Sequence, residues 1–314
     1  MPSVSDPMTT PAGLDTIYAW IASLRLRTLS LASCGIVLGG SLAAVAGENA
    51  WRLSVWIAAL ITAVSLQLLA NLANDYGDYL KASDSPERVG PKRGMQMGII
   101  LPAQMRKALG LMTALTILSG LTLLALACHS FSDILFFLGL GALSIVAAIT
   151  YTVGRHAYGY HSLGDVSVLA FFGWVSVIGS FYLLAGYFDA RVFVPATACG
   201  LLSVLVLNVN NLRDLEEDRR HNKITLAVRL GSRGARFYHV ALLLAILACL
   251  MAAAWYWMPE RPWVWLWALA LPLFYQNLRA ALQFEETTEF RTQLAVAVKI
   301  NILALGGFAA GLWI

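Results

Sequence analysis

Charged residues are scarce in this chain of 314 residues. Only 13% of them are Asp, Glu, Lys or Arg, whereas 59% are hydrophobic. A soluble domain carries about 25% charged residues, so the charges present here could not cover a water-facing globule of this size. The composition excludes a soluble enzyme and a disordered chain, and it indicates a membrane protein that crosses the bilayer several times.

Cysteine and histidine are also rare, with four cysteines and five histidines. The cysteines are far apart and form no Cys-x-x-Cys pair, and the histidines do not cluster at the spacing of a zinc site. We therefore expect reduced, packed cysteines and no zinc centre. The first fifteen residues lack the basic segment and short apolar core of a cleaved signal peptide, so none is expected.

Apolar stretches recur along the sequence, and each is about as long as a helix needs to cross roughly 30 Å of hydrocarbon. We therefore predict an all-α fold in which nine transmembrane helices form one bundle. The bundle is expected to be a single domain over residues 1–314 with a polar tail over 1–19. The predicted helices cover residues 29–46, 53–73, 109–127, 135–152, 166–186, 192–212, 240–258, 264–282 and 294–314.

Basic residues are distributed very unevenly between the predicted connections. If the N-terminus is cytoplasmic, only Arg52, Arg191 and Arg261 of the 22 Lys and Arg residues fall on the opposite side. Lys and Arg concentrate in cytoplasmic connections of membrane proteins, so we predict a cytoplasmic N-terminus. The two longest and most polar connections, 74–107 and 213–236, then lie on the cytoplasmic side, where long loops tend to carry function.

Acidic residues open both of these long connections at helical spacing. Asn74 and Asp78 are four residues apart, as are Asp214 and Asp218, so each pair shares one helix face if the helices continue past the membrane surface. The Asp214 and Asp218 carboxylates would repel each other unless a cation lay between them. Oxygen ligands favour Mg²⁺, which proteins commonly share with a substrate diphosphate.

The alternative interpretation is that these polar residues merely end helices and solvate loops. One cluster would leave that question open. Two clusters at matching helix ends, both mixed with Lys and Arg, favour the binding of a metal and a diphosphate.

The sequence around these clusters resembles the UbiA superfamily of intramembrane prenyltransferases, whose two aspartate-rich motifs lie at the cytoplasmic ends of helices two and six. The similarity covers essentially the whole chain. Three stretches carry it: NLANDYGDYLKASDSPERVGPKRGMQMG over 71–98, AAITYTVGRHAYGYHSLGDVSVLAFFGW over 147–174, and LNVNNLRDLEEDRRHNKITLAVRLG over 207–231. Within the family, they are most similar to members that act on 1,4-dihydroxy-2-naphthoate in menaquinone synthesis.

The resemblance implies a reaction and a cellular location. A polyprenyl diphosphate would alkylate 1,4-dihydroxy-2-naphthoate with loss of carbon dioxide and diphosphate, giving a demethylmenaquinol. Mg²⁺ would be the cofactor, and the active-site loops would face the cytoplasm from the bacterial inner membrane. The expected partners are these two substrates and the lipid bilayer, with no nucleic acid.

The resemblance also assigns metal ligands residue by residue. The family's motifs, NDxxDxxxD and DxxxDxxxD, match this sequence except at the last aspartate of each. Ala82 and Asn222 occupy those two positions, and Asp84 lies two residues beyond Ala82. The implied Mg²⁺ ligands are Asn74, Asp75, Asp78, Asp214 and Asp218.

Basic and polar side chains complete the expected site, because ionisation of the allylic C–O bond leaves negative charge on the diphosphate. Arg155 is the only basic residue of its loop and would contact the diphosphate or the aromatic acid, although an interfacial anchor also explains it. Asp165 would orient or deprotonate a naphthoate hydroxyl, with a helix N-cap as the alternative. The diphosphate-binding candidates are Arg88, Lys92, Arg93 and Lys223, and the candidates for the acceptor pocket are Asn71, Tyr151 and Asn211.

Two other functions compete with this assignment. A membrane transporter would place ionisable groups near the bilayer midplane on broken helices, whereas the acidic groups here gather at one surface. A sibling prenyltransferase that acts on 4-hydroxybenzoate or homogentisate is a nearer alternative. The GPKRG and YGYHSLGD stretches weigh against the sibling by resemblance.

Overall fold

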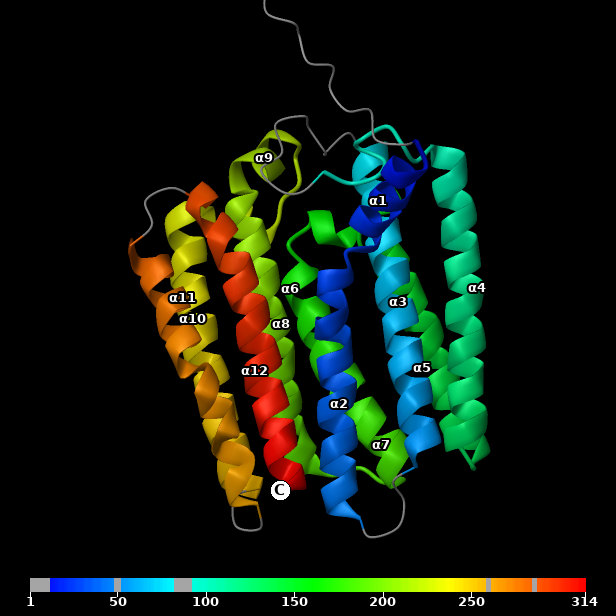
Figure 1. The fold of residues 1–314 in the computed structure, drawn as a ribbon, viewed down its shortest axis with the longest axis vertical. Helices are drawn as coiled ribbons and strands as arrows, with labels where there is room; N and C mark the ends of the chain where they lie inside the picture. The colour runs from blue at the N-terminus through cyan, green and yellow to red at the C-terminus, as the bar shows by residue number, and fades with distance from the viewer. Residues whose placement is uncertain (1–11, 48–51, 82–91, 258–260, 284–286) are drawn as a thin grey trace, which may run out of the picture.

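The computed structural model describes residues 12–47, 52–81, 92–257, 261–283 and 287–314. Within these ranges the chain is helical, apart from turns and one isolated bridge between His161 and Ile224. Long helices run side by side in a bundle (Figure 1). The main helices are α1 Ala12–Leu24, α2 Leu29–Ala46, α3 Leu53–Leu80, α4 Pro102–Ala127, α5 Phe131–Thr150, α8 Phe193–Arg213, α9 Leu215–Arg220, α10 Leu226–Trp257, α11 Leu271–Gln283 and α12 Gln293–Trp313.

One further helix combines three segments, α6 Gly164–Val168, the π-helical η3 Leu169–Ile178, and α7 Gly179–Ala185. The remaining segments are 3-10 helices: η1 Leu26–Thr28, η2 Tyr158–Tyr160, η4 Ala190–Val192, η5 Pro262–Ala270 and η6 Thr287–Thr292. All described elements are thus helical, which confirms the predicted all-α class.

Eight helical stretches of the described residues are long and apolar enough to cross a membrane, so the protein is a multi-pass membrane protein. The predicted helix at 264–282 is present as η5 and α11 and runs beside α10 (Figure 1). It is not one of the eight, because Gln276, Asn277 and Arg279 lower its hydropathy. The stretches are Asp15–Ala46, Leu53–Leu80, Pro102–Ala127, Phe131–Thr150, Gly164–Ala185, Ala190–Arg213, Leu226–Trp257 and Glu289–Trp313.

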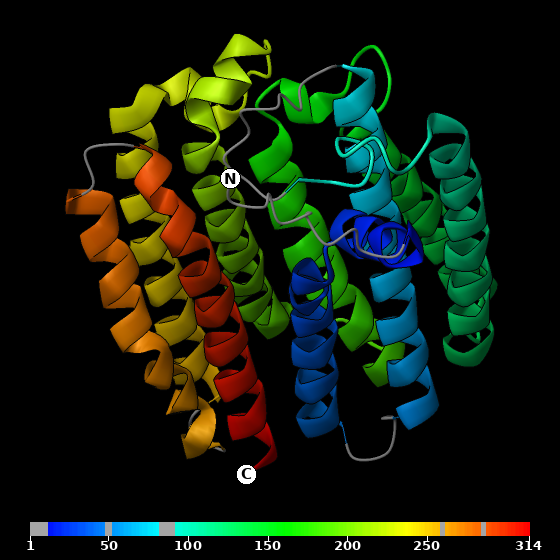
Figure 2. The same ribbon diagram turned by 45° about the horizontal axis from the view of Figure 1, so that its top comes forward.

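Helices also extend into segments that the sequence analysis predicts as loops or as the N-terminal tail. Helix α3 continues to Leu80, α4 starts at Pro102, and α9 and α10 fill most of 213–236, with a left-handed break at Gly231 (φ 72°). Helix α1 begins inside the predicted polar tail of 1–19, continues to Leu24 and lies across α3 (Figure 2). The apolar stretches therefore underestimate the helices, since polar residues continue them at the end where α1 and α9 lie.

Close backbone contacts hold α6, η3 and α7 between α2 and α8. A Cβ at Gly39 of α2 would lie 2.4 Å from the Val177 carbonyl oxygen, and one at Gly173 would lie 2.6 Å from the Ala196 carbonyl oxygen. Neither site has room for a side chain. Small residues at helix interfaces allow such approach in membranes, where the packing of side chains and backbone drives helix association.

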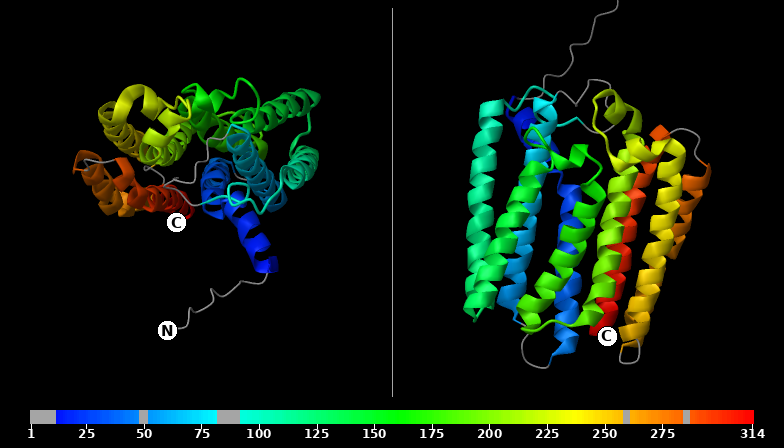
Figure 3. Two further views of the ribbon diagram at one scale, coloured as in Figure 1. Left: turned by 90° about the horizontal axis from the view of Figure 1, so that it is seen from above. Right: turned by 180° about the vertical axis from the view of Figure 1, so that it is seen from behind.

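The two edges of the bundle differ from its centre. Helices α4 and α5 lie at one edge, and α10 and α11 lie at the other (Figure 3). In the most apolar part of α5, only 6% of the residues are buried inside the protein. In the stretch Ala190–Arg213, which contains α8, the corresponding share is 72%. Half of the α5 side chains are exposed and most of the others are half-buried, as expected of a helix with one lipid-facing side.

A buried chain of hydrogen bonds connects four helices near α11. Asn208 donates to Nδ1 of His239 (3.0 Å), whose Nε2 donates to Asn277 (2.7 Å), and Asn277 donates to Gln293 (3.1 Å). All four side chains are buried. Because the Asn208 amide donates to Nδ1 and the Asn277 oxygen can only accept, the imidazole proton is assigned to Nε2. This chain explains how the less apolar α11 is held against α10 and α12.

We expect Asn277→Leu to lower the free energy of unfolding in detergent by about 1–3 kcal/mol, because His239 and Gln293 would each lose a buried partner. Thermal unfolding of the purified protein measures this. The matched control is Gln276→Leu, since Gln276 is exposed on the same helix. Equal melting temperatures for the two variants would contradict a stabilising role for the chain of hydrogen bonds.

Candidate active site

Asp78, in the last turn of α3, is the meeting point of three loops. It is buried, accepts a hydrogen bond from the Arg93 guanidinium, and accepts another from the Tyr160 hydroxyl at 2.8 Å. The Lys223 ammonium lies 3.9 Å from its Oδ1. Side chains that follow α3, α5 and α9 in the sequence therefore converge on one carboxylate.

Lys223 joins this carboxylate to the second acidic cluster. Its ammonium lies 3.5 Å from Oδ1 of Asp218, in α9. Burial alone would lower the pKa of Lys223, but the carboxylates of Asp78 and Asp218 outweigh burial and raise it. Burial raises the pKa of Asp218 to about 6; Lys223 opposes this shift, and Asp214 and Asp78 add to it. The two acidic motifs thus share one cation.

A short backbone bridge sets the relative position of Tyr160 and Lys223. The Ile224 N–H donates to the Tyr160 carbonyl (3.2 Å), and the Ser162 hydroxyl donates to the Ile224 carbonyl (2.8 Å). The Lys81 ammonium lies 3.7 Å from the centre of the Tyr160 ring. Burial lowers the pKa of Lys81, the nearby Asp78 carboxylate opposes this, and Lys223 adds to it.

The other predicted metal ligands already have protein partners. The Thr152 hydroxyl lies within hydrogen-bond distance of both the Ala73 carbonyl (3.0 Å) and the Asn74 side-chain oxygen (3.1 Å), and both Asp214 oxygens accept from Arg213 at 2.6 Å. Asp75 is fully buried and points toward α1. Among the described residues, no three His, Cys, Asp or Glu side chains gather closely enough to hold a metal alone.

The predicted diphosphate-binding residues differ in placement. Arg93 and Lys223 both lie at Asp78, whereas Lys92 is exposed. Arg88 lies outside the described residues, as do Ala82 and Asp84. Asn222 is exposed with a φ of 54°, a left-handed conformation that asparagine tolerates in turns. Its backbone therefore turns the chain after α9.

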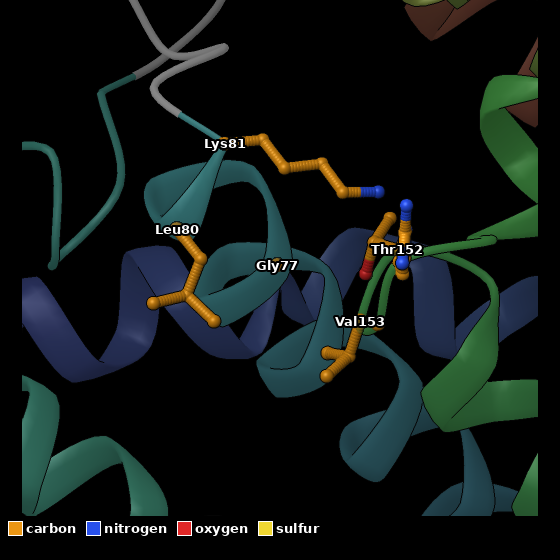
Figure 4. A pocket seen from close by; sticks show the side chains of 7 residues that line it. Gly77, Leu80, Lys81, Thr152 and Val153 are labelled. Atoms are coloured by element: carbon orange, nitrogen blue, oxygen red, sulfur yellow. The ribbon is translucent and has the colours of Figure 1, made fainter.

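A cavity of about 310 Å³ opens between the end of α3 and the turn after α5, lined on α3 by residues next to Asp78 in the sequence. Figure 4 shows the Lys81 side chain extending across it toward Thr152. Arg155 is exposed at this cavity. The lining residues are Gly77, Leu80, Lys81, Thr152, Val153, Gly154 and Arg155.

The residues predicted to contact the aromatic acceptor lie in different surroundings. Asp165 is buried in the first turn of α6 and accepts a hydrogen bond from the Tyr238 hydroxyl (3.1 Å). Burial raises the pKa of Tyr151, and the carboxylates of Asp165, Asp78 and Asp218 raise it further. Tyr151 therefore lies within the electrostatic field of both acidic regions.

The two asparagines predicted for the acceptor pocket have different surroundings. Asn71 donates hydrogen bonds to the Leu24 carbonyl (2.8 Å) and the Thr28 hydroxyl (3.0 Å), so it fastens α3 to the chain after α1. Asn211 is half-buried near the end of α8.

Sequence reasoning did not single out Lys81, Ser23 or Tyr238 as site residues, and it considered Tyr160 only as a possible lining of the aromatic pocket, not as a partner of Asp78. Each acts through a contact with a residue far away in the chain; Tyr160 and Asp78, for example, are 82 residues apart. The dense glycine and tyrosine content of 158–164 is the one local signal, because it indicates a tightly folded loop. It does not reveal which carboxylate the loop approaches.

Known proteins show similarity along almost the whole chain. A model of the UbiA prenyltransferase family matches residues 33–303. A relative from Escherichia coli (strain K12) is 48% identical over 296 residues, which is 94% of this chain and 95% of the relative. One from Haemophilus influenzae (strain ATCC 51907 / DSM 11121 / KW20 / Rd) is 42% identical over 96% of this chain and 97% of its own. Both are named 1,4-dihydroxy-2-naphthoate octaprenyltransferase.

Solved structures share the fold at low sequence identity. The apo structure of a UbiA homolog from Aeropyrum pernix K1 superposes with a TM-score of 0.70 and 18% identity, over 90% of this chain and 97% of that one. A UbiA homolog from Archaeoglobus fulgidus bound to DMAPP and Mg²⁺ gives 0.61 and 14%, over 92% and 99%. With the family match over 33–303, these similarities place the chain in the UbiA prenyltransferase family.

Proposed function

We propose that this protein transfers a polyprenyl group from polyprenyl diphosphate to 1,4-dihydroxy-2-naphthoate, releasing carbon dioxide and diphosphate and forming a demethylmenaquinol. The observation that carries the proposal is the junction at Lys223, which lies within 3.9 Å of Asp78 and 3.5 Å of Asp218. The relatives at 48% and 42% identity support the naphthoate as acceptor.

The donor set fits Mg²⁺ bound together with a diphosphate. Mg²⁺ prefers oxygen ligands and usually binds through one or two carboxylates plus substrate phosphates, so a protein cage of three acids is not required. Asn74, Asp78, Asp214 and Asp218 would hold it, with Asp78 and Asp218 already facing the same cation. When bound, the metal neutralises charge that develops on the leaving diphosphate.

Basic and acidic side chains of the protein would bind the diphosphate and handle the proton of the acceptor. Arg93 and Lys223 stand at the carboxylates, where they can donate to diphosphate oxygens. Arg155 and Lys81 line the adjacent cavity and extend the positive surface. Asp165, buried beside Tyr238, accepts or orients the proton of a naphthoate hydroxyl. The apolar bundle keeps water from the allylic cation.

We also propose an arrangement of the chain in the membrane. The chain crosses the bacterial inner membrane nine times, with η5 and α11 as one of the spans, and its N-terminus is cytoplasmic. The ends of α3 and α9 then face the cytoplasm. The uneven distribution of Lys and Arg supports this orientation.

We expect the purified protein to form demethylmenaquinol from 1,4-dihydroxy-2-naphthoate and a polyprenyl diphosphate only when Mg²⁺ is present. Chelation with EDTA should lower the rate by at least about 10³-fold, because several kcal/mol of leaving-group stabilisation would be lost. Product is quantified by liquid chromatography, and added Mg²⁺ should restore the rate.

Three measurements separate the alternatives. With 4-hydroxybenzoate in place of the naphthoate we expect little product, and efficient use of it would favour the sibling enzyme. Undiminished turnover in EDTA would contradict the metal assignment. Uptake of either substrate into proteoliposomes without product would favour a transporter.

A further inference from the structure

Ser23, on α1, connects two parts of the candidate active site. Its hydroxyl donates to Oδ2 of Asp75 at 2.5 Å and accepts the Gly94 N–H at 3.1 Å. The Ala19 carbonyl is also 3.1 Å from the hydroxyl, but a serine has one proton, and a carboxylate is the stronger acceptor. Ser23, Asp75 and Gly94 are all buried.

The contact with Ser23 leaves no room for a side chain at position 94. A Cβ there would lie 2.7 Å from Ser23 Oγ, 2.8 Å from the Ala19 carbonyl oxygen and 2.3 Å from the Ile100 side chain. The segment that starts at Gly94 folds back on itself, because the Ile100 N–H donates to the Gly94 carbonyl at 3.2 Å. Met95 and Ile100 pack with Ala19 in a small core. The segment is therefore fixed to α1.

Arg93 directly precedes this anchored glycine, and its guanidinium binds Asp78. The position of that guanidinium depends on where Gly94 is held. Asp75 and Asp78 share α3, but Asp75 contacts Ser23 whereas Asp78 contacts Arg93, Tyr160 and Lys223. The two aspartates of one motif thus face different partners.

We infer that Asp75 is a positioning residue: through Ser23 it holds Gly94 so that Arg93 lies on Asp78, which makes α1 part of the diphosphate site. This inference rests on the proposed function for its kinetic consequences, but not for the contact itself. It replaces the role of metal ligand that the family resemblance implies for Asp75.

The kinetic test compares Ser23→Ala with Asp75→Ala and their double variant. We expect each to lower kcat/KM for the polyprenyl diphosphate about tenfold, the loss typical of a hydrogen bond to a charged group. The double variant should lose no more than Ser23→Ala alone, because that variant already removes both the bond to Asp75 and the bond from Gly94. The Mg²⁺ concentration for half-maximal rate should stay within twofold, and Asp75→Asn, which keeps an acceptor, should recover most of the loss.

A second measurement reads the contact without turnover. Trypsin should cleave purified Ser23→Ala after Arg93 at least several-fold faster than the parent protein, giving a fragment that begins at Gly94. Ser30→Ala is the control, because its hydroxyl donates within its own turn to the Arg27 carbonyl. Unchanged cleavage in Ser23→Ala would overturn the inference.

The outcomes also separate this inference from the proposed function. A tenfold or larger rise in the Mg²⁺ requirement in Asp75→Asn would make Asp75 a metal ligand and overturn the inference. Faster trypsin cleavage in a protein that forms no prenylated naphthoate would uphold the contact and reject the proposed function.

Discussion

Replacement of Asp78 by asparagine should lower turnover by about 10³-fold while the protein stays folded in the membrane. Asp78 is the carboxylate on which Arg93, Tyr160 and Lys223 converge. Asparagine keeps the size of the side chain but removes the charge that would hold Mg²⁺, and metal stabilisation of a leaving group contributes several kcal/mol. Product formation at saturating Mg²⁺ and naphthoate measures the loss.

Asp189→Asn is the matched control for this prediction. Asp189 is also paired with an arginine, Arg191 at 2.7 Å, but it precedes α8, at the helix end opposite the second acidic motif. We expect this variant to turn over at the normal rate. If Asp78→Asn kept more than a tenth of the parent activity, Asp78 would not be a metal ligand.

The second large effect is expected from Lys223→Met. Lys223 lies between Asp78 and Asp218, where we propose that it binds the diphosphate. The loss of one preorganised charge that stabilises the developing anion typically costs about 10²–10³-fold in rate. We expect a drop of that size in kcat, with a higher KM for the polyprenyl diphosphate, measured by steady-state kinetics.

The same variant should change the pH dependence. Burial raises the pKa of Asp218 to about 6, and Lys223 opposes the shift. Without Lys223 the pKa of Asp218 rises further, so the carboxylate is protonated at higher pH. Because only the ionised form binds a cation well, the acidic limb of the rate profile should move to higher pH.

Two comparisons make this prediction specific. Lys223→Arg retains the charge and should keep the acidic limb near its original position. Lys107→Met removes a charge from the exposed side of α4 and should change neither rate nor pH profile. A parent-like profile in Lys223→Met would rule out coupling between Lys223 and Asp218.

The sequence predicts well those features that depend on neighbouring residues. Apolar runs locate the helices, and the i, i+4 spacing places Asn74 near Asp78 on α3. Contacts between distant segments are not encoded in such spacing. The bond from Ser23 to Asp75 joins residues 52 apart, and no periodicity indicates that Asp75 faces α1 and not the cation at Lys223.

The structure also differs from the sequence-based prediction at the ends of helices and in the least apolar of the predicted membrane spans. Polar residues such as Asn74 and Asp78 interrupt the apolar run, yet α3 continues to Leu80 because tertiary partners satisfy those side chains. Helix α11 contains Asn277 for a similar reason, since the buried chain of hydrogen bonds accommodates its amide. In both cases, packing in three dimensions outweighs local hydropathy.

The outward exposure of α5 makes the surrounding amphiphile a component of the folded state. One side of α5 packs against α3 and α4, and half of its side chains are exposed, so acyl chains must cover the exposed side. The turn that follows α5 carries Thr152 and Arg155, which line the cavity at the end of α3. We therefore expect the thickness and chemistry of the lipid or detergent to influence the position of that turn, and with it the shape of the cavity.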